Sequence, residues 1–446
     1  MADLLQIGAS GVRAYQTALT AVGENIANTG TDGYSRRSVT LREVGTTGGA
    51  TSNRLSPGAG VMIDGIARAT DTYLTAGLRS ATSDLQRSQS GAVWLSRIQD
   101  VMTGDKVSDQ LTGFFTAARG AASDPTSSAL RTNMLEAAKS AAFAFTATDK
   151  AFDATQADFD GQAREAAQSL SALAVSLTRV NDGLTRTQAG TATAAQLADQ
   201  RDQLLSQMSA LSDINVTTDE LGRATVRIGD RVGPILASPD TLGSISYSRL
   251  TGGGISFTVA SQGKLTQVVP AGGTLGGLVD GAERIAAMRD SFNTVAQDFA
   301  NTMNTIQAKG QDANGATGQP MFTMTSGGGM TVAFTDASKI AAAGIDKGPR
   351  NTDNLSAIEA SRYTGQFEGR LTNIITENAS TLKQRQTIAD AQSAISDGAK
   401  AALTGATGVT LDSEAVSLMR FQQAYSATSR VIQVARDTFQ SILEIR

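Results

Sequence analysis

Apolar residues near both ends of the chain recur at alternating spacings of three and four, over residues 5–26 and 418–442. On a helix this spacing places the side chains along one narrow stripe, the pattern of a coiled-coil seam. Such a stripe does not stabilise a lone helix in water, so each helix needs a partner, and the simplest partner is the other terminus. The first seam consists of Leu5, Gly8, Val12, Tyr15, Leu19, Val22 and Ile26. The second consists of Leu418, Phe421, Tyr425, Thr428, Ile432, Ala435, Phe439 and Ile442.

Helical periodicity also dominates the middle of the chain. The C-terminal helix is expected to begin near Asp412, whose side chain is placed to cap it, with Glu414 in its first turn. In the longest stretch, Phe145, Phe152 and Phe159 recur every seven residues, and we interpret them as a packing seam. The remaining helices are expected over residues 70–102, 107–122, 126–189, 193–212, 280–307, 353–365 and 366–400.

A region of different periodicity interrupts the helices. Residues 214–275 contain short runs that alternate apolar and polar positions between Gly-rich turns, which predicts a small β domain. Residues 38–44 and 61–66 are predicted to be extended around a Gly-rich loop, and residues 310–336 to form a loop with strands. The chain is therefore expected to be mainly α with an inserted β domain.

This order of elements predicts a nested, elongated architecture, because N- and C-terminal segments must pair at each level. Residues 1–35 and 405–446 would form a terminal coiled-coil domain. Residues 36–213 and 276–404 would form a helical bundle domain with short β elements, and residues 214–275 a β-rich outer domain.

The stretch ENIANTGTDGYSRR, residues 24–37, lies directly after the first seam. Asn28, Gly30 and the Asp32-Gly33 pair predict the end of a helix followed by a turn, since Asn and Gly tolerate a left-handed backbone. Two roles stay open for Tyr34, Arg36 and Arg37: bracing the exit of the chain from the terminal helix, or contacting a neighbouring subunit.

Composition restricts the function more than it suggests one. The chain has no Cys and no His, which removes thiolate nucleophiles, disulfides and the commonest general base and metal ligand. The formal net charge is −4 and no long run of one sign occurs, so a nucleic-acid partner is not expected. The first 15 residues do not resemble a secretory signal, and no apolar run approaches the roughly 20 residues that span a bilayer.

Three candidate sites were weighed for chemistry, and none is convincing. The loop 310–318 resembles a calcium loop, but the twelfth position from Asp312 is Thr323 rather than Glu, so we expect a turn. Ser380 and Lys383 match a hydrolase motif whose companion motif is absent. The charges at 199–202 are interpreted as helical ion pairing. We therefore expect no catalytic residues, metal, cofactor or small-molecule substrate.

The apolar seams of the two terminal helices allow two interpretations. One possibility is an intramolecular coiled coil that closes a domain, and the other is packing against copies or relatives in a filament. Small residues favour the second, and Gly8 and Gly11 each cost about 1 kcal/mol relative to Ala in a helix. A helix that accepts this cost is expected to become ordered on assembly.

Both ends resemble a known class of assembly protein. The segment SGVRAYQTALTAVGENIANTGTDGYSRR (10–37) resembles the N-terminal signature of bacterial flagellar rod, hook and hook-associated proteins, through Ala27, Asn28, Thr29, Gly33 and Tyr34. The segment 411–446 resembles the C-terminal signature of the same class. The internal blocks 58–81, 197–216 and FQQAY (421–425) resemble the FlgK family of hook–filament junction proteins; residues 214–275 carry the least specific similarity.

The resemblance implies a structural, non-enzymatic protein that leaves the cell through the flagellar type III export channel and resides in the extracellular flagellum. It also implies self-association in a ring and contacts with the hook protein and a second hook–filament junction protein. An export chaperone would bind the C-terminal region. The terminal helices would line the inner tube, with the helical domain next and the β domain outermost.

Two alternatives stay open: a flagellar hook or distal-rod protein, against which the middle helices argue, and, more remotely, a secreted β-rich hydrolase or adhesin. The residues expected to carry assembly contacts lie on the two seams and in the turn between them. They are Leu5, Val12, Tyr15, Leu19, Val22, Ile26, Asn28, Gly33, Tyr34, Leu418, Phe421, Tyr425, Ile432, Phe439 and Ile442.

Overall fold

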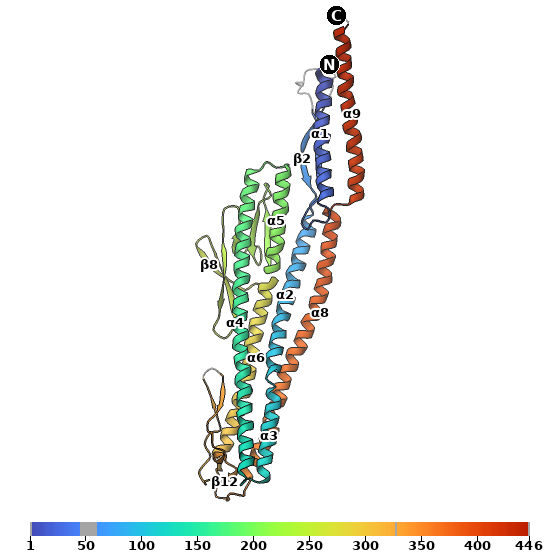
Figure 1. Ribbon diagram of the computed structural model, residues 1–446. Coiled ribbons are helices and arrows are strands. Elements are labelled where there is room, and N and C mark those ends of the chain that lie inside the picture. The colour runs from blue at the N-terminus through green and yellow to red at the C-terminus, as the bar shows by residue number, and fades with distance from the viewer. Residues whose placement is uncertain (1, 45–59, 326–327, 445–446) are drawn as a thin grey trace.

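The computed structural model describes residues 2–44, 60–325 and 328–444. It is an elongated, mainly helical molecule with both ends of the chain at one end of its long axis (Figure 1). There, α1 (Ala2–Ala27) lies alongside α9 (Leu411–Glu444). Next along the axis, α2 (Thr72–Gly104) lies alongside α8 (Phe367–Thr407). The expected pairing of N- and C-terminal segments at successive levels is therefore confirmed.

The other helices build the bundle beyond this second pair. α4 is the longest and runs along the bundle with α5 and α6 beside it (Figure 1). α6 and α8 extend across the limits expected at 275/276 and 404/405, and the division into three domains stays a prediction. The bounds of these helices are α3 Val107–Ser123, α4 Ser128–Arg186, α5 Ala192–Leu211, α6 Gly273–Ala308 and α7 Asp353–Gly365.

Three of the described helices, α2, α4 and α5, begin where a side chain accepts a hydrogen bond from a free amide of the first turn. The side chains of Asp71 and Thr191 accept such hydrogen bonds at the starts of α2 and α5. The expectation for the C-terminal helix was wrong in one detail. α9 begins at Leu411, because the carbonyl of Thr410 already accepts the first helical hydrogen bond. Asp412 therefore lies inside the first turn and does not cap it.

The aromatic repeat of α4 lies in the core. Phe145, Phe152 and Phe159 are fully buried, with the Phe159 ring centroid 4.7 Å from that of Trp94 and the Phe145 centroid 5.6 Å from that of Phe292. The interpretation of this repeat as a packing seam is confirmed. A second aromatic cluster fills the far end of the bundle with Phe114, Phe115, Phe299, Phe322 and Phe367.

The period-two region forms two antiparallel three-stranded sheets beside α4 (Figure 1). Their orders are β3-β4-β5 and β6-β7-β8. The side chain of Asn181 on α4 exchanges two hydrogen bonds of 2.9 Å with the backbone of Ala224 and so holds the first sheet against the helix. The strands are β3 Ile214–Thr218, β4 Ala224–Ile228, β5 Ile235–Ala237, β6 Ser244–Arg249, β7 Ile255–Ser261 and β8 Lys264–Val268.

A hairpin of β1 (Arg37–Glu43) and β2 (Val61–Arg68) connects α1 to α2. The Gly-rich loop expected between these strands falls largely on residues 45–59, which lie outside the described residues. The segment 310–344 forms two short strand pairs, as expected for a loop with strands. They are β9 (Gly310–Gln311) with β12 (Ala343–Gly344), and β10 (Phe322–Met324) with β11 (Met330–Val332).

Candidate assembly surface and the elbow beneath it

The terminal helices α1 and α9 pack antiparallel along a face lined by glycine. A Cβ atom on Gly8 would lie 2.6 Å from Cγ1 of Ile432, and one on Gly11 would lie 2.6 Å from Cγ2 of Thr428. Real Cβ contacts are longer than this, so any side chain at these two positions would push the helices apart. The two glycines lower the helix propensity of α1, but they allow α9 to approach it closely.

The hairpin covers a second face of α1. The Val61 amide donates to Oγ of Ser10 at 3.2 Å. Ala14, Ala18 and Ala21 lie on the same face as Ser10 by helical geometry, and each is at most 4% exposed. The small residues of α1 therefore accommodate two neighbours within the chain, α9 and the hairpin, which the sequence did not predict.

The stretch from Asn28 to Arg36, called the elbow here, ends α1 and turns the chain into β1. The Asn28 side chain donates to the Glu24 carbonyl at 2.9 Å, and both Gly30 and Gly33 have φ near +80°. The predicted helix end and turn are thus present. Gln203 of α5 donates to the Asp32 carbonyl at 2.9 Å, so the elbow rests on the helical bundle.

A buried amide connects the elbow to both terminal helices. Asn25 is 1% exposed, and its Nδ2 donates to the Arg37 carbonyl at 2.8 Å and to Oε2 of Glu414 at 3.1 Å. Its Oδ1 accepts from the Tyr34 hydroxyl and from the Arg37 amide, both at 2.9 Å. The other carboxylate oxygen of Glu414 accepts from Nε of Arg36 at 2.6 Å. Residues from α1, the elbow and α9 therefore meet in one closed network.

The network continues into the bundle through ion pairs. Arg37 binds Glu24 at 3.1 Å and Asp199 at 3.3 Å, and Arg68 on β2 binds Asp199 at 2.8 Å and also Asp202. The carboxylates at 199 and 202 were expected to pair within their own helix. Asp202 does pair with Arg201 of its own helix at 2.7 Å, as expected. Asp199 instead pairs with arginines of β1 and β2, and Arg68 also reaches Asp202, so this charged cluster fastens the hairpin to α5.

Tyr34, Arg36 and Arg37 brace the exit of the chain from α1. The Arg37 guanidinium carbon lies 4.9 Å from the centroid of the Tyr34 ring, within the range of a cation–π contact. Burial raises the pKa of the Tyr34 phenol above its usual value, although the Arg37 charge acts to lower it. The phenol is therefore a neutral hydrogen-bond donor to Asn25 at physiological pH.

The face of α9 that points away from α1 carries a row of apolar residues, called the outer stripe here. Val416, Met419, Val431 and Val434 are between 39% and 63% exposed, and Ala427 lies among them. At 100° per residue, this row is opposite Phe421, Tyr425 and Ile432. A shallow hollow of about 450 Å³ lies beside it, lined by Met419, Gln422, Gln423, Ser426, Ala427 and Arg430.

The structure brings together only part of the expected assembly set. The Tyr15 and Phe421 ring centroids lie 6.4 Å apart, Val22 is buried, and Ile432 faces Gly8. Leu5, Val12, Leu19, Ile26, Leu418 and Tyr425 are partly exposed along the edges of the two-helix contact.

Phe439 does not complete the seam within the chain. The pairing of Gly8 with Ile432 and of Gly11 with Thr428 places Phe439 beyond Ala2, the first described residue of α1. Its side chain is accordingly 51% exposed. The side chain of Ile442 lies outside the described residues.

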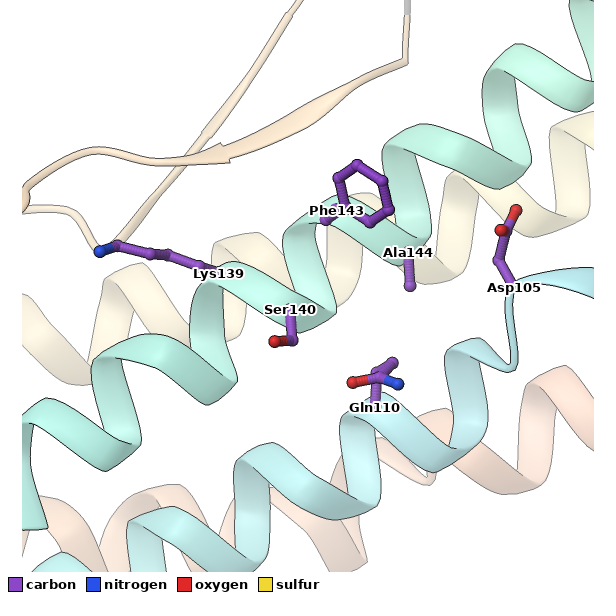
Figure 2. Close-up of a pocket in the computed structure, with 6 residues that line it drawn as sticks. All are labelled: Asp105, Gln110, Lys139, Ser140, Phe143 and Ala144. Atoms are coloured by element: carbon purple, nitrogen blue, oxygen red, sulfur yellow. The ribbon is translucent and has the colours of Figure 1, made fainter.

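Two features on the surface of the described residues bear on possible chemistry. A hollow of about 410 Å³ lies between α3 and α4. Figure 2 shows the residues that line it, which are Asp105, Gln110, Lys139, Ser140, Phe143 and Ala144. Lys139 binds Glu136 at 2.7 Å rather than Ser140, so no base is paired with this hydroxyl there. Asp312 accepts the amides of Asn314 and Ala316, as a turn requires.

Over residues 2–44, 60–325 and 328–444, no group of three or more acidic side chains is arranged to hold a metal ion. None of the helices in these ranges is long and apolar enough to cross a membrane.

Sequence reasoning missed Asn25 and treated Glu414 only as a favourable first-turn charge. A signal for Asn25 exists, since it continues the 14-18-21 spacing of small residues by one further step of four. No comparable local signal exists for Glu414, because its partners come from the other end of the chain. The outer stripe was also missed, because its apolar residues fall outside the three-and-four spacing of the seam on the same helix.

Comparison with known proteins gives two matches to family models. The model described as "Flagellar hook-associated protein FlgK helical domain" matches residues 95–322, just over half of the chain. The model described as "Flagellar basal body rod FlgEFG protein C-terminal" matches residues 405–445, which include all of α9.

Two curated relatives agree with these matches. The chain is 24% identical over 343 residues to flagellar hook-associated protein 1 of Salmonella typhimurium, and 22% identical over 331 residues to that of Escherichia coli. The alignments cover 73% and 72% of this chain but 60% of each relative. The solved structure of the flagellar hook junction protein FlgK from Burkholderia pseudomallei is 17% identical, with a TM-score of 0.49 over 56% of this chain and 46% of that one.

Proposed function

Because the chain belongs to the FlgK family of flagellar hook-associated proteins, we propose that it is a structural axial component of the bacterial flagellum that forms the junction between hook and filament. The curated relatives that it resembles are named flagellar hook-associated protein 1. The chain spans about 60% of their length, so the role of the whole protein is carried over as part of this proposal.

The outer stripe of α9 is the observation that supports the proposal most. A long helix that turns a row of valines and a methionine to solvent has apolar area to bury, and copies of the same helix pair are well suited to cover it. The seam residues that are partly exposed along the edges of the α1–α9 contact would add to the same interface. In a ring of copies, the terminal helix pairs would stand side by side around the axis.

The proposed partners follow from this position. Besides other copies of itself, the chain would contact the hook protein on one side and the second hook–filament junction protein on the other. Before assembly, an export chaperone would cover the apolar C-terminal region, including Phe439. The protein would be non-enzymatic and would act outside the cell after flagellar export, with the β sheets outermost.

A hook or distal-rod role is the second candidate, because the match at 405–445 is to a family of rod proteins. The helical-domain match over 95–322 favours the junction, since that model is described for FlgK.

The test introduces charge on the outer stripe without touching the α1–α9 contact. Val416→Asp with Val434→Asp, expressed in cells of the source bacterium that lack the native copy, is expected to abolish swimming and release filament protein into the medium. The matched control, Ala415→Asp with Gln433→Asp, adds the same charges to exposed positions of the same turns, about 100° around the helix from Val416 and Val434. Swimming cells with attached filaments in the stripe variant would contradict the proposed assembly surface.

A further inference from the structure

The apolar contacts between α1 and α9 would be similar in more than one register of the two helices. The side of α1 that faces α9 offers Gly8, Gly11 and Tyr15 in succession. If α9 moved along α1 by four residues, Ile432 would leave Gly8 and face Gly11, and Tyr425 would replace Phe421 opposite Tyr15. A branched side chain would still meet a glycine, and an aromatic ring would still meet an aromatic ring. Apolar packing alone therefore leaves a one-turn slip poorly penalised.

The polar network distinguishes the two registers sharply. In the observed register, both amide protons of Asn25 and both oxygens of Glu414 have partners within hydrogen-bond distance. Asn25 is 1% exposed and the Glu414 side chain is 1% exposed, so water does not replace a lost partner. After a one-turn slip, Leu418 would face Asn25, leaving a buried amide group and a buried carboxylate without each other.

We propose that the buried Asn25–Glu414 pair selects the register of α1 against α9. A single buried polar contact is a known means of fixing alignment in coiled coils whose apolar contacts are permissive. The register determines which residues of α9 project beyond the end of α1. It also determines the position of the outer stripe along the long axis of the molecule. The inference depends on contacts within one chain and does not require the proposed function.

Disulfide trapping tests the register directly, since the chain has no native cysteine. The observed register is reported by Gly11→Cys with Thr428→Cys, because a Cβ on Gly11 would lie 3.3 Å from Cβ of Thr428, close to disulfide geometry. The slipped register is reported by Gly11→Cys with Ile432→Cys and Thr428→Ala, the last of which removes the Cγ2 atom that the new Cβ would otherwise meet at 2.6 Å. Each pair is placed in the full chain with the native network and in a background carrying Asn25→Leu with Glu414→Met, which fills the same space without polar groups.

With the native network, the first pair is expected to form its intramolecular disulfide at least about tenfold faster than the second under mild oxidation in dilute monomer. In the Leu/Met background the two rates are expected to converge to within about threefold. A third background, Glu414→Gln, keeps hydrogen-bonding capacity toward Asn25 and is expected to restore the preference for the first pair. Circular dichroism on each variant verifies that its helices are retained.

Either of two results would overturn the proposal. If the second pair stays at least tenfold slower in the Leu/Met background, the short connection between α8 and α9 fixes the register instead. If the two pairs form at equal rates with the native network, the register is not fixed at all.

Discussion

At the level of single residues, Glu414 brings a negative charge into a site between two helices. Its oxygens bond to Asn25 and Arg36, and its side chain is 1% exposed. A buried charge is tolerated only while its partners are present, because each side chain left alone keeps the full penalty of lost hydration. The free energy that depends on this residue is therefore much larger than that of an ordinary first-turn acid.

Glu414→Ala is expected to destabilise the terminal helix pair by about 1–3 kcal/mol, because it leaves one buried amide proton of Asn25 without an acceptor. Hydrogen exchange of α1 and α9 peptides measures this as lost protection. Asp412→Ala is the matched control, since Asp412 lies in the same turn but is exposed, and it is expected to cost under about 1 kcal/mol. Equal effects of the two substitutions would contradict the importance given to the buried network.

A second residue gives stability a dependence on pH. Burial, together with the hydrogen bond that its hydroxyl donates to Asp160, raises the pKa of Tyr247 from 10.0 to about 12. The unfolded chain therefore releases this proton at lower pH than the folded one does. The stabilisation is fully present below about pH 10 and is lost as pH rises from there toward about 12.

In Tyr247→Phe, the free energy of unfolding is expected to decrease less steeply as the pH rises through this range. Urea unfolding between about pH 9 and pH 11.5 measures this. Tyr73→Phe serves as the control, because Tyr73 is 83% exposed. It should follow the parent curve. A parent slope equal to that of Tyr247→Phe would show that the raised pKa does not contribute.

At the level of elements, the contact between α1 and α9 depends on the absence of a side chain at glycine. Alanine is a better helix former than glycine, yet a methyl group at Gly11 would lie 2.6 Å from the Thr428 side chain. Gly23 lies in the same helix with nothing within 4 Å of its built Cβ atom. The two positions therefore separate intrinsic helix propensity from packing.

Gly11→Ala is expected to lower the stability of the terminal pair by about 1–3 kcal/mol through overpacking. Gly23→Ala is expected to raise it by up to about 1 kcal/mol through propensity alone. Hydrogen exchange of α9, a helix that neither substitution alters, provides the measurement. A stabilising effect of Gly11→Ala would mean that the close approach of the two helices is not maintained in solution.

Element boundaries were predictable where the period of the sequence changes. The seven-residue repeat of Phe145, Phe152 and Phe159 predicted both a helix and its buried face. The change to period two at Ile214 predicted the sheets. β5 was missed because three residues are too few to display a period. The start of α6 at Gly273 was missed because a run of glycines resembles a loop.

Contacts between distant segments were far less predictable. The pairing of the two termini followed from their matching seams, but the hairpin on α1 and the arginine partners of Asp199 did not. A charge pattern read along one helix finds partners three or four residues away, whereas Arg37 and Arg68 reach Asp199 from separate strands. The elbow was predicted as a turn, but its network was not, because it combines residues from both ends of the chain.

At the level of the whole molecule, α9 and its exposed apolar residues lie at the end where both termini lie (Figure 1). The ion pairs between the hairpin and α5, together with the elbow network, join this end to the bundle. A protein built in this way can present the terminal helix pair at a defined height, which an axial assembly requires if neighbouring copies are to match. The central proposal is therefore that the terminal pair is an assembly element of a protein at the hook–filament junction.

The most direct test locates the protein on the flagellum. Val232 is 87% exposed in the β region, far from the terminal helices in sequence, and the chain has no native cysteine, so Val232→Cys can be labelled specifically with a thiol-reactive fluorophore on intact cells. The account predicts one compact focus where each filament meets its hook, and no focus with the unsubstituted chain. Label distributed along the hook, or absent from flagella that still carry filaments, would contradict it.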